Sequence, residues 1–163
     1  MSITIRRANI DDAEAIANII NNVVDEKKYT SLRKFSVEEE REYINSLNKR
    51  EAIFVATKNG KIIGFQDISL FAKWSESMSH VGNILTLILK EYRNQGIGKL
   101  LAERTLEFAR QNGYEKVSTY IMKDNINAIN YYKSLGFNPV GRWLKQVKID
   151  GNYHDDLIME LFL

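Results

Sequence analysis

The sequence predicts a mixed α/β sheet flanked by helices, with the element order βααβββαβαββ. Three observations favour this fold class. Runs of β-branched and aromatic residues alternate with amphipathic helical patterns. Two pairs of strand-like runs meet at Asn59-Gly60 and at Asp150-Gly151, dipeptides that tolerate positive φ and suit tight hairpin turns. A third apolar run, at 81–90, passes directly into a glycine-containing turn and a helical pattern.

The amino-terminal third indicates strand, helix, helix. The opening strand is SITIRRA. Behind an acidic start, the next segment places apolar residues at helical spacings, namely Ile10, Ala13, Ile16, Ile19, Ile20 and Val23. Ser36 and Glu39 have the spacing of a capping box, which predicts a second helix over 37–47.

The remaining elements follow from the same kinds of signal. EAIFVATK and KIIGFQDISLF form the first hairpin, and the run at 81–90 is the next strand. The central helix ends at Gly113 and the shorter helix NINAINYYKSL ends at Gly136, where glycine suits a carboxyl cap. KVSTYIM is a strand between them, and the tail is a hairpin. The central helix has one buried face, formed by Ile97, Leu101, Thr105 and Phe108.

Length and composition favour one globular domain over 1–163, since no Pro/Gly/Ser-rich linker interrupts the 163 residues. No run approaches the roughly 20 apolar residues that cross a bilayer, and no secretion signal opens the chain, so we expect a cytoplasmic protein without a membrane partner. The absence of cysteine excludes thiolate catalysis and cysteine-bound zinc, and two histidines make a poor metal site. A net charge of only +2 gives no reason to expect nucleic-acid binding.

The segment YRNQGIGKLL, at 92–101, raises the question of which anion its glycines approach. A P-loop is excluded, because it needs glycine where Arg93 stands and a hydroxyl residue where Leu100 stands. A dinucleotide fingerprint is disfavoured by Leu101 in place of its third glycine. The alternative to an anion site is a tight turn in which the glycines have only a structural role. A strand, then Arg93-x-x-Gly96-x-Gly98, then a helix directs free N–H groups and the helix dipole at one point, which favours a diphosphate.

These residues resemble the R/Q-x-x-G-x-G/A signature of the GNAT superfamily of acyl-CoA-dependent N-acyltransferases. A second signature, N-x-x-A-(I)-x-x-Y-x-x-x-G-F, is matched from Asn125 to Phe137. The resemblance implies the GNAT acyl-CoA N-acyltransferase fold. It further implies that acetyl-CoA is a cosubstrate and that a primary amine attacks the acetyl group directly, without a metal or a covalent enzyme intermediate.

The resemblance also assigns roles to residues. The pantetheine arm would lie along the exposed edge of the fourth strand at Thr86, Leu87 and Ile88, with an oxyanion donor at a main-chain N–H near Leu87. Asn125 would contact pantetheine, Tyr132 would protonate the departing thiolate, and Tyr131 would belong to the core. The diphosphate would lie on the segment Arg93, Asn94, Gln95, Gly96, Ile97, Gly98 and Lys99, mainly on its main-chain N–H groups.

One departure concerns the general base, because Tyr120 stands where alanine acetyltransferases of ribosomal proteins carry a glutamate. The candidates are His80, Asn83 through an ordered water, Glu26, His154 and bulk water. Trp74, Tyr153 and Glu26 could line an acceptor pocket.

The acceptor itself is left open among a small amine, an amino acid, a polyamine and a protein amino terminus. A non-catalytic acyl-CoA-binding sensor or interaction module is the alternative function. A homodimer through the edge of the terminal hairpin is possible.

Overall fold

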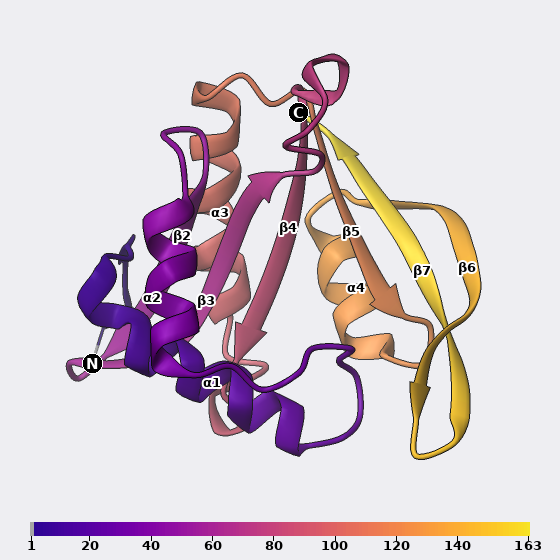
Figure 1. The fold of residues 1–163 in the computed structure, drawn as a ribbon, viewed down its shortest axis with the longest axis horizontal. Helices are drawn as coiled ribbons and strands as arrows, with labels where there is room; N and C mark the ends of the chain where they lie inside the picture. The colour runs from indigo at the N-terminus through magenta and orange to yellow at the C-terminus, as the bar shows by residue number, and fades with distance from the viewer. Residues whose placement is uncertain (1) are drawn as a thin grey trace.

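Helices cover both faces of a seven-stranded sheet in the computed structural model, which describes residues 2–163 (Figure 1). The element order βααβββαβαββ is confirmed. The helices are α1 (Ala13–Asp25), α2 (Val37–Ser46), α3 (Ile97–Gln111) and α4 (Ile126–Ser134). The strands are β1 (Thr4–Arg7), β2 (Ala52–Lys58), β3 (Lys61–Leu70), β4 (Val81–Ile88), β5 (Lys116–Met122), β6 (Asn138–Ile149) and β7 (Asn152–Phe162).

The strands lie in the order β1-β2-β3-β4-β5-β7-β6, so β1 and β6 are the two edges. Within residues 2–163, every neighbouring pair is antiparallel except β4 and β5, which run parallel. That parallel pairing lasts for three residue pairs and ends at Asn83 opposite Ser118. Beyond that point β5 continues along β7, while β4 continues along β3. Figure 1 shows the two strands diverging from there.

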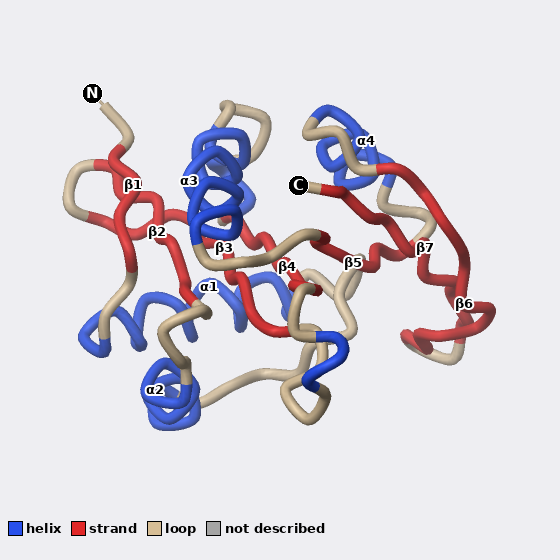
Figure 2. Tube along the Cα trace, turned by 90° about the horizontal axis from the view of Figure 1, so that it is seen from above, coloured by secondary structure: helices blue, strands red, loops and turns tan. Residues whose placement is uncertain are grey.

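Each face of the sheet has its own hydrophobic core. On one face, α3 and α4 cover a cluster that includes Ile97, Leu101 and Phe137. On the other, α1 packs Ile16 and Ile19 against the apolar side chains of β2 and β3. Figure 2 shows the two helix pairs on opposite sides of the strands. The helical spacing of apolar residues therefore predicted which face of each helix packs against the sheet.

The predicted turns and caps are confirmed. Asn59 and Gly60 have φ of 53° and 76°, and Asp150 and Gly151 have φ of 47° and 83°, as a tight hairpin turn requires. The main-chain N–H of Glu39 donates to Ser36 Oγ at 3.1 Å, and that of Ser36 donates to Glu39 Oε2 at 2.8 Å.

The strand expected over 81–90 ends at Ile88, other ends differ by one or two residues, and two helices start later than expected. Ile10 lies outside α1, in a short 3-10 turn at Ile10–Asp12, because Asp12 accepts a hydrogen bond from the Asn9 N–H and pairs with Arg6. Asn125 caps α4 rather than forming its first turn, since its Oδ1 accepts the Ala128 N–H at 3.2 Å. Side chains that fold back onto the main chain thus delay the start of both helices.

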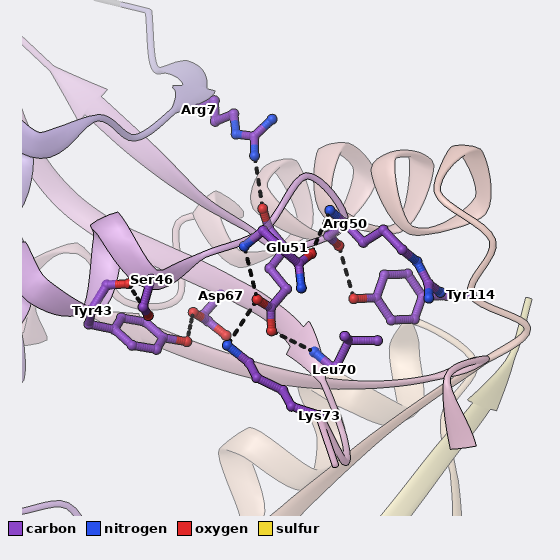
Figure 3. A network of polar contacts seen from close by, with 10 residues as sticks. Arg7, Tyr43, Ser46, Arg50, Glu51, Asp67, Leu70, Lys73 and Tyr114 are labelled. Atoms are coloured by element: carbon purple, nitrogen blue, oxygen red, sulfur yellow. Dashed lines mark hydrogen bonds and ion pairs between the residues drawn. The ribbon is translucent and has the colours of Figure 1, made fainter. Parts of the chain in front are cut away.

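A buried acidic network ties the α2–β2 connection to the end of β3 (Figure 3). The wholly buried Glu51 accepts the Leu70 N–H at 3.1 Å and the Asn48 N–H at 3.2 Å, and Lys73 Nζ lies 2.9 Å from its carboxylate. Beside it, the Tyr43 hydroxyl donates to Asp67 at 2.6 Å. Burial raises the pKa of Asp67 to about 6. Burial first, and then the charge of Asp67, raises the pKa of Glu40 to about 7.

Glu40→Gln should make folding less sensitive to pH. Because the pKa of Glu40 is raised in the folded state, its contribution to stability is present in acid and is lost as pH rises through about 7. The neutral glutamine carries no such proton, so we expect the free energy of unfolding at about pH 8 to rise by about 1–2 kcal/mol. Urea unfolding between about pH 5 and pH 8 measures this.

The exposed Glu42→Gln, on the same helix, is the matched control and should keep the wild-type profile. An unchanged pH slope in Glu40→Gln would show that Glu40 does not take up this proton.

Candidate active site

A cavity of about 560 Å³ occupies the space where β4 and β5 diverge. One wall is β4 from Asn83 to Ile88, and the opposite wall is β5 from Thr119 to Met122 together with α4. The turn before α3 lines one end, and residues 29–32, in the segment that follows α1, also contribute to the lining. At the top of the gap the Thr119 hydroxyl donates to the Ile84 carbonyl at 3.0 Å. Past this bond β4 presents main-chain groups with no β5 partner.

The turn before α3 presents unpaired N–H groups to this cavity. Asn94 and Gly96 have φ of 61° and 78°, so the chain winds through left-handed conformations immediately before the helix. The N–H groups of Lys99 and Leu100 bond to the Gly96 carbonyl, whereas those of residues 94–98 have no acceptor within the described chain, residues 2–163. Consecutive free N–H groups at a helix N-terminus form a site for an anion.

Glycine is required at the two positions of this turn for different physical reasons. A Cβ on Gly96 would meet no atom within 4 Å, but its φ of +78° disfavours any other residue. A Cβ on Gly98 would lie 2.8 Å from the ring of Tyr131, whose hydroxyl donates to the Gly98 carbonyl at 2.8 Å. Close packing of α4 against α3 therefore requires glycine at position 98, whether or not a ligand also approaches it.

The side chain of Arg93 is fixed by hydrogen bonds to other parts of the protein. Its Nε donates to the Ile88 carbonyl at 2.9 Å, and its guanidinium forms two hydrogen bonds with the carboxylate of Glu26. This pair joins the end of α1 to the turn before α3. The bond to Arg93 lowers the pKa of Glu26, so this carboxylate is a weak base.

Tyr132 lies at the centre of a buried polar chain. Its hydroxyl is 2.8 Å from Thr86 Oγ1, and Gln66 Nε2 donates to that same Thr86 oxygen at 2.7 Å and to the Tyr131 hydroxyl at 3.1 Å. Burial raises the pKa of both tyrosines, so each holds its proton at neutral pH. Because Thr86 accepts from Gln66, its own proton can point at Tyr132, which leaves the phenol proton free for the cavity.

Most of the expected cofactor residues lie in the cavity wall. Gln95 is not among them, because its side chain turns back to donate to the Glu91 carbonyl at 2.9 Å. Ile97 contributes mainly to the core, with 1% of its surface exposed. The expected residues that line the cavity are Thr86, Leu87, Ile88, Arg93, Asn94, Gly96, Ile97, Gly98, Lys99, Asn125 and Tyr132.

The candidate bases are scattered. Asn83 lines the cavity beside β5, and Glu26 lines it at the opposite end. His80 and His154 are absent from its lining, and His154 Nδ1 lies 2.9 Å from Asp124. Trp74 is 84% exposed, and neither it nor Tyr153 lines a cavity described here. The structure thus brings only Asn83 and Glu26 of these residues to the cavity.

A second cavity of about 460 Å³ adjoins the first and shares Ser31, Asn83, Tyr120 and Asp156 with it. Asp156 is a residue that sequence reasoning missed. It stands in an otherwise strand-like tail and looks like one of two surface acids in Asp155-Asp156. The available signal was strand alternation, which puts one of the two on the covered face of the sheet.

Two features of the described chain, residues 2–163, bear on the class of site. None of its helices has the length and apolar character needed to span a membrane. No cluster of three or more His, Asp or Glu side chains in it is arranged to hold a metal ion.

Comparisons with known proteins agree with this geometry. An uncharacterized N-acetyltransferase of Methanocaldococcus jannaschii is 29% identical over 155 residues, which are 89% of this chain and 66% of that protein. An N-alpha-acetyltransferase of Sulfurisphaera tokodaii is 29% identical over 93% of this chain and 86% of its own length.

Solved structures extend the similarity to the whole fold. A GNAT-family acetyltransferase from Streptococcus pneumoniae has a TM-score of 0.91 at 26% identity, covering 99% of this chain and 100% of its own. The Salmonella typhimurium protein yncA, solved with its cofactor acetyl-CoA, has a TM-score of 0.93 at 21% identity, covering 100% of this chain and 95% of its own. The model of the Acetyltransferase (GNAT) family matches residues 19–137, so the chain belongs to the GNAT family of acetyltransferases.

Proposed function

We propose that this chain is an N-acetyltransferase that moves the acetyl group of acetyl-CoA to a primary amine by direct attack. The observation that carries the proposal is one continuous cavity with free main-chain N–H groups at one end and the Tyr132 hydroxyl in its wall. Family membership supports acetyl transfer, and the two relatives named as N-acetyltransferases support an amine as the acceptor.

The cavity suits acetyl-CoA in shape and in chemistry. The free N–H groups of residues 94–98 would hold the diphosphate, with Lys99 supplying a positive charge beside them. The unpaired side of β4 at Thr86, Leu87 and Ile88 would take the amide-containing pantetheine arm, as an added strand would be taken. Asn125 keeps its side-chain NH₂ for the same arm, because the cap uses only its oxygen.

The chemistry requires two proton movements. The amine nitrogen attacks the thioester carbonyl carbon, a C–N bond forms and the C–S bond breaks. The nitrogen gives up a proton and the thiolate takes one. Tyr132 would protonate the sulfur, and a main-chain N–H near Leu87 would stabilise the oxyanion during attack. Thr86 would orient the phenol through the 2.8 Å hydrogen bond.

We further propose that the chain works as a single domain over 1–163 and that it acts in the cytoplasm, which its lack of cysteine favours. A homodimer would use β6, an edge strand whose side chains are mostly exposed. Size-exclusion chromatography with light scattering tests the homodimer.

Tyr132→Phe should lower kcat for thiol release from acetyl-CoA by about 10²-fold, because it removes the proton donor and little else. The Kd for acetyl-CoA, measured by calorimetry, should change by less than about threefold. Tyr153→Phe removes a hydroxyl from an exposed residue outside both cavities and should behave like wild type.

If kcat of Tyr132→Phe stays near the wild-type value, Tyr132 is not the acid. If the wild-type protein binds acetyl-CoA tightly but releases no thiol with any amine, the chain is a non-catalytic acyl-CoA-binding module.

Asn94→Asp should weaken acetyl-CoA binding by about 5- to 10-fold at low ionic strength, because it places a negative charge beside the expected diphosphate. Aspartate tolerates the left-handed backbone of this position, so the turn should keep its shape. The effect should shrink as salt is added.

Asn59→Asp is the matched control. It makes the same charge change at a residue of similar positive φ, in a hairpin turn that does not line the cavity. Equal losses of affinity in the two variants, or none in Asn94→Asp, would remove the diphosphate from this turn.

A further inference from the structure

Asp156 is a buried carboxylate at the junction of the two cavities. It lies on β7, opposite Met122 of β5 and Trp143 of β6, and only 3% of its surface is exposed. Both cavities nevertheless include it in their lining. Asp156 therefore lies where the two cavities meet.

This carboxylate has no partner among the residues that the structure describes, 2–163. Its neighbour Asp155 points to the other side of the strand, accepts the Lys145 N–H at 2.8 Å and lies 3.6 Å from Arg142. No corresponding hydrogen bond or ion pair reaches Asp156. Burial first, and then the charge of Asp155, raises its pKa. A buried carboxylate without a partner is costly unless a ligand supplies one.

The rest of the second cavity indicates what that ligand carries. Its walls hold three aromatic rings, and those of Tyr120 and Trp143 lie with centroids 5.5 Å apart. Asp156 is its one charged residue, and no Lys, Arg or His lines it. The remaining lining is apolar or neutral, namely Ser31, Ser69, Leu70, Phe71, Asn83, Gln146 and Val147. One negative charge in a mostly uncharged cavity matches a ligand with one positive charge.

We propose that Asp156 binds the ammonium group of the acceptor and takes its proton, and that the acceptor is a small monocationic amine with an apolar or aromatic body. This inference rests on the proposed acetyl transfer. A free amino acid fits poorly because its carboxylate would meet Asp156 and no cation. A polyamine fits poorly because its second ammonium would find no counter-charge.

The proton balance is complete. The ammonium gives one proton to the Asp156 carboxylate, and the neutral amine attacks the thioester carbon. As the C–S bond breaks, Tyr132 protonates the thiolate, and the second proton lost by the nitrogen restores the phenol. Asp156 then passes its proton to solvent when the amide leaves, so each turnover releases one proton.

The substrate class is tested with phenethylamine, phenylalanine and putrescine as acceptors in a thiol-release assay. The kcat/KM for phenethylamine should exceed that for each of the other two by at least about tenfold. An equal or higher value for phenylalanine or putrescine overturns the proposed substrate class.

Asp156→Asn tests the residue. It should lower kcat/KM for phenethylamine by about 10²-fold and leave the Kd for acetyl-CoA within about twofold. The loss should be smaller for β,β-difluorophenethylamine, whose less basic nitrogen is already largely neutral near pH 7.5 and needs no base. The preference for phenethylamine over phenylalanine should also fall, since the carboxylate that repels the amino acid is gone. Asp155→Asn, on the opposite side of the strand, is the matched control and should stay within about threefold of wild type.

A kcat/KM for Asp156→Asn near that of wild type, or an equal loss with both amines, overturns the base role. Absence of thiol release by wild-type protein with every amine would instead overturn the proposed acetyl transfer, and this inference with it.

Discussion

The site depends on the early end of one strand pairing. β4 and β5 are hydrogen-bonded neighbours for only three residue pairs, after which each strand follows a different partner. A parallel pair needs a crossover, and α3 supplies it while its N-terminal turn lies at the opening between the two strands. Unpaired main-chain groups, a helix N-terminus and a cavity therefore arise together from one feature of the topology.

Polar groups buried beside this opening are held by one another. Gln66, on β3 opposite Thr86, uses both N–H bonds of its amide, one on Thr86 and one on Tyr131. Its Oε1 has no partner within residues 2–163. Leaving a buried amide oxygen without a hydrogen bond costs stability. The two N–H bonds of the same amide help to fix the orientation of two tyrosines on α4. The polar chain links the core of the sheet to the cavity wall.

Local signals in the sequence predicted the fold well, and long-range pairings explain what they missed. The hairpins at Asn59-Gly60 and Asp150-Gly151 and the capping box at Ser36 depend on residues a few positions apart, so their spacing was sufficient. The requirement for Gly98 was only partly foreseen, because it comes from Tyr131 on another helix.

The same limit applied to charged side chains. The ion pair of Arg93 with Glu26 joins residues 67 positions apart, and nothing in either segment indicates it. The place of Asp156 depends on how β7 registers with β5 and β6, so the sequence alone does not distinguish its burial from exposure. Charged residues were thus the least predictable members of the site, since their environment is set by segments distant in sequence.

The proposed acid and base also need to be kept apart. Tyr132 and Asp156 both line the first cavity, but only Asp156 also lines the second, and no hydrogen bond within residues 2–163 joins the two side chains. If the phenol donated to the carboxylate, as Tyr43 does to Asp67, its proton would point away from the thiolate and one carboxylate oxygen would already be occupied. Burial raises the pKa of each group, and in the proposed reaction the phenol keeps its proton until the thiolate leaves while the carboxylate receives one. In the proposed reaction, an amine in the second cavity meets a thioester in the first at the opening between β4 and β5.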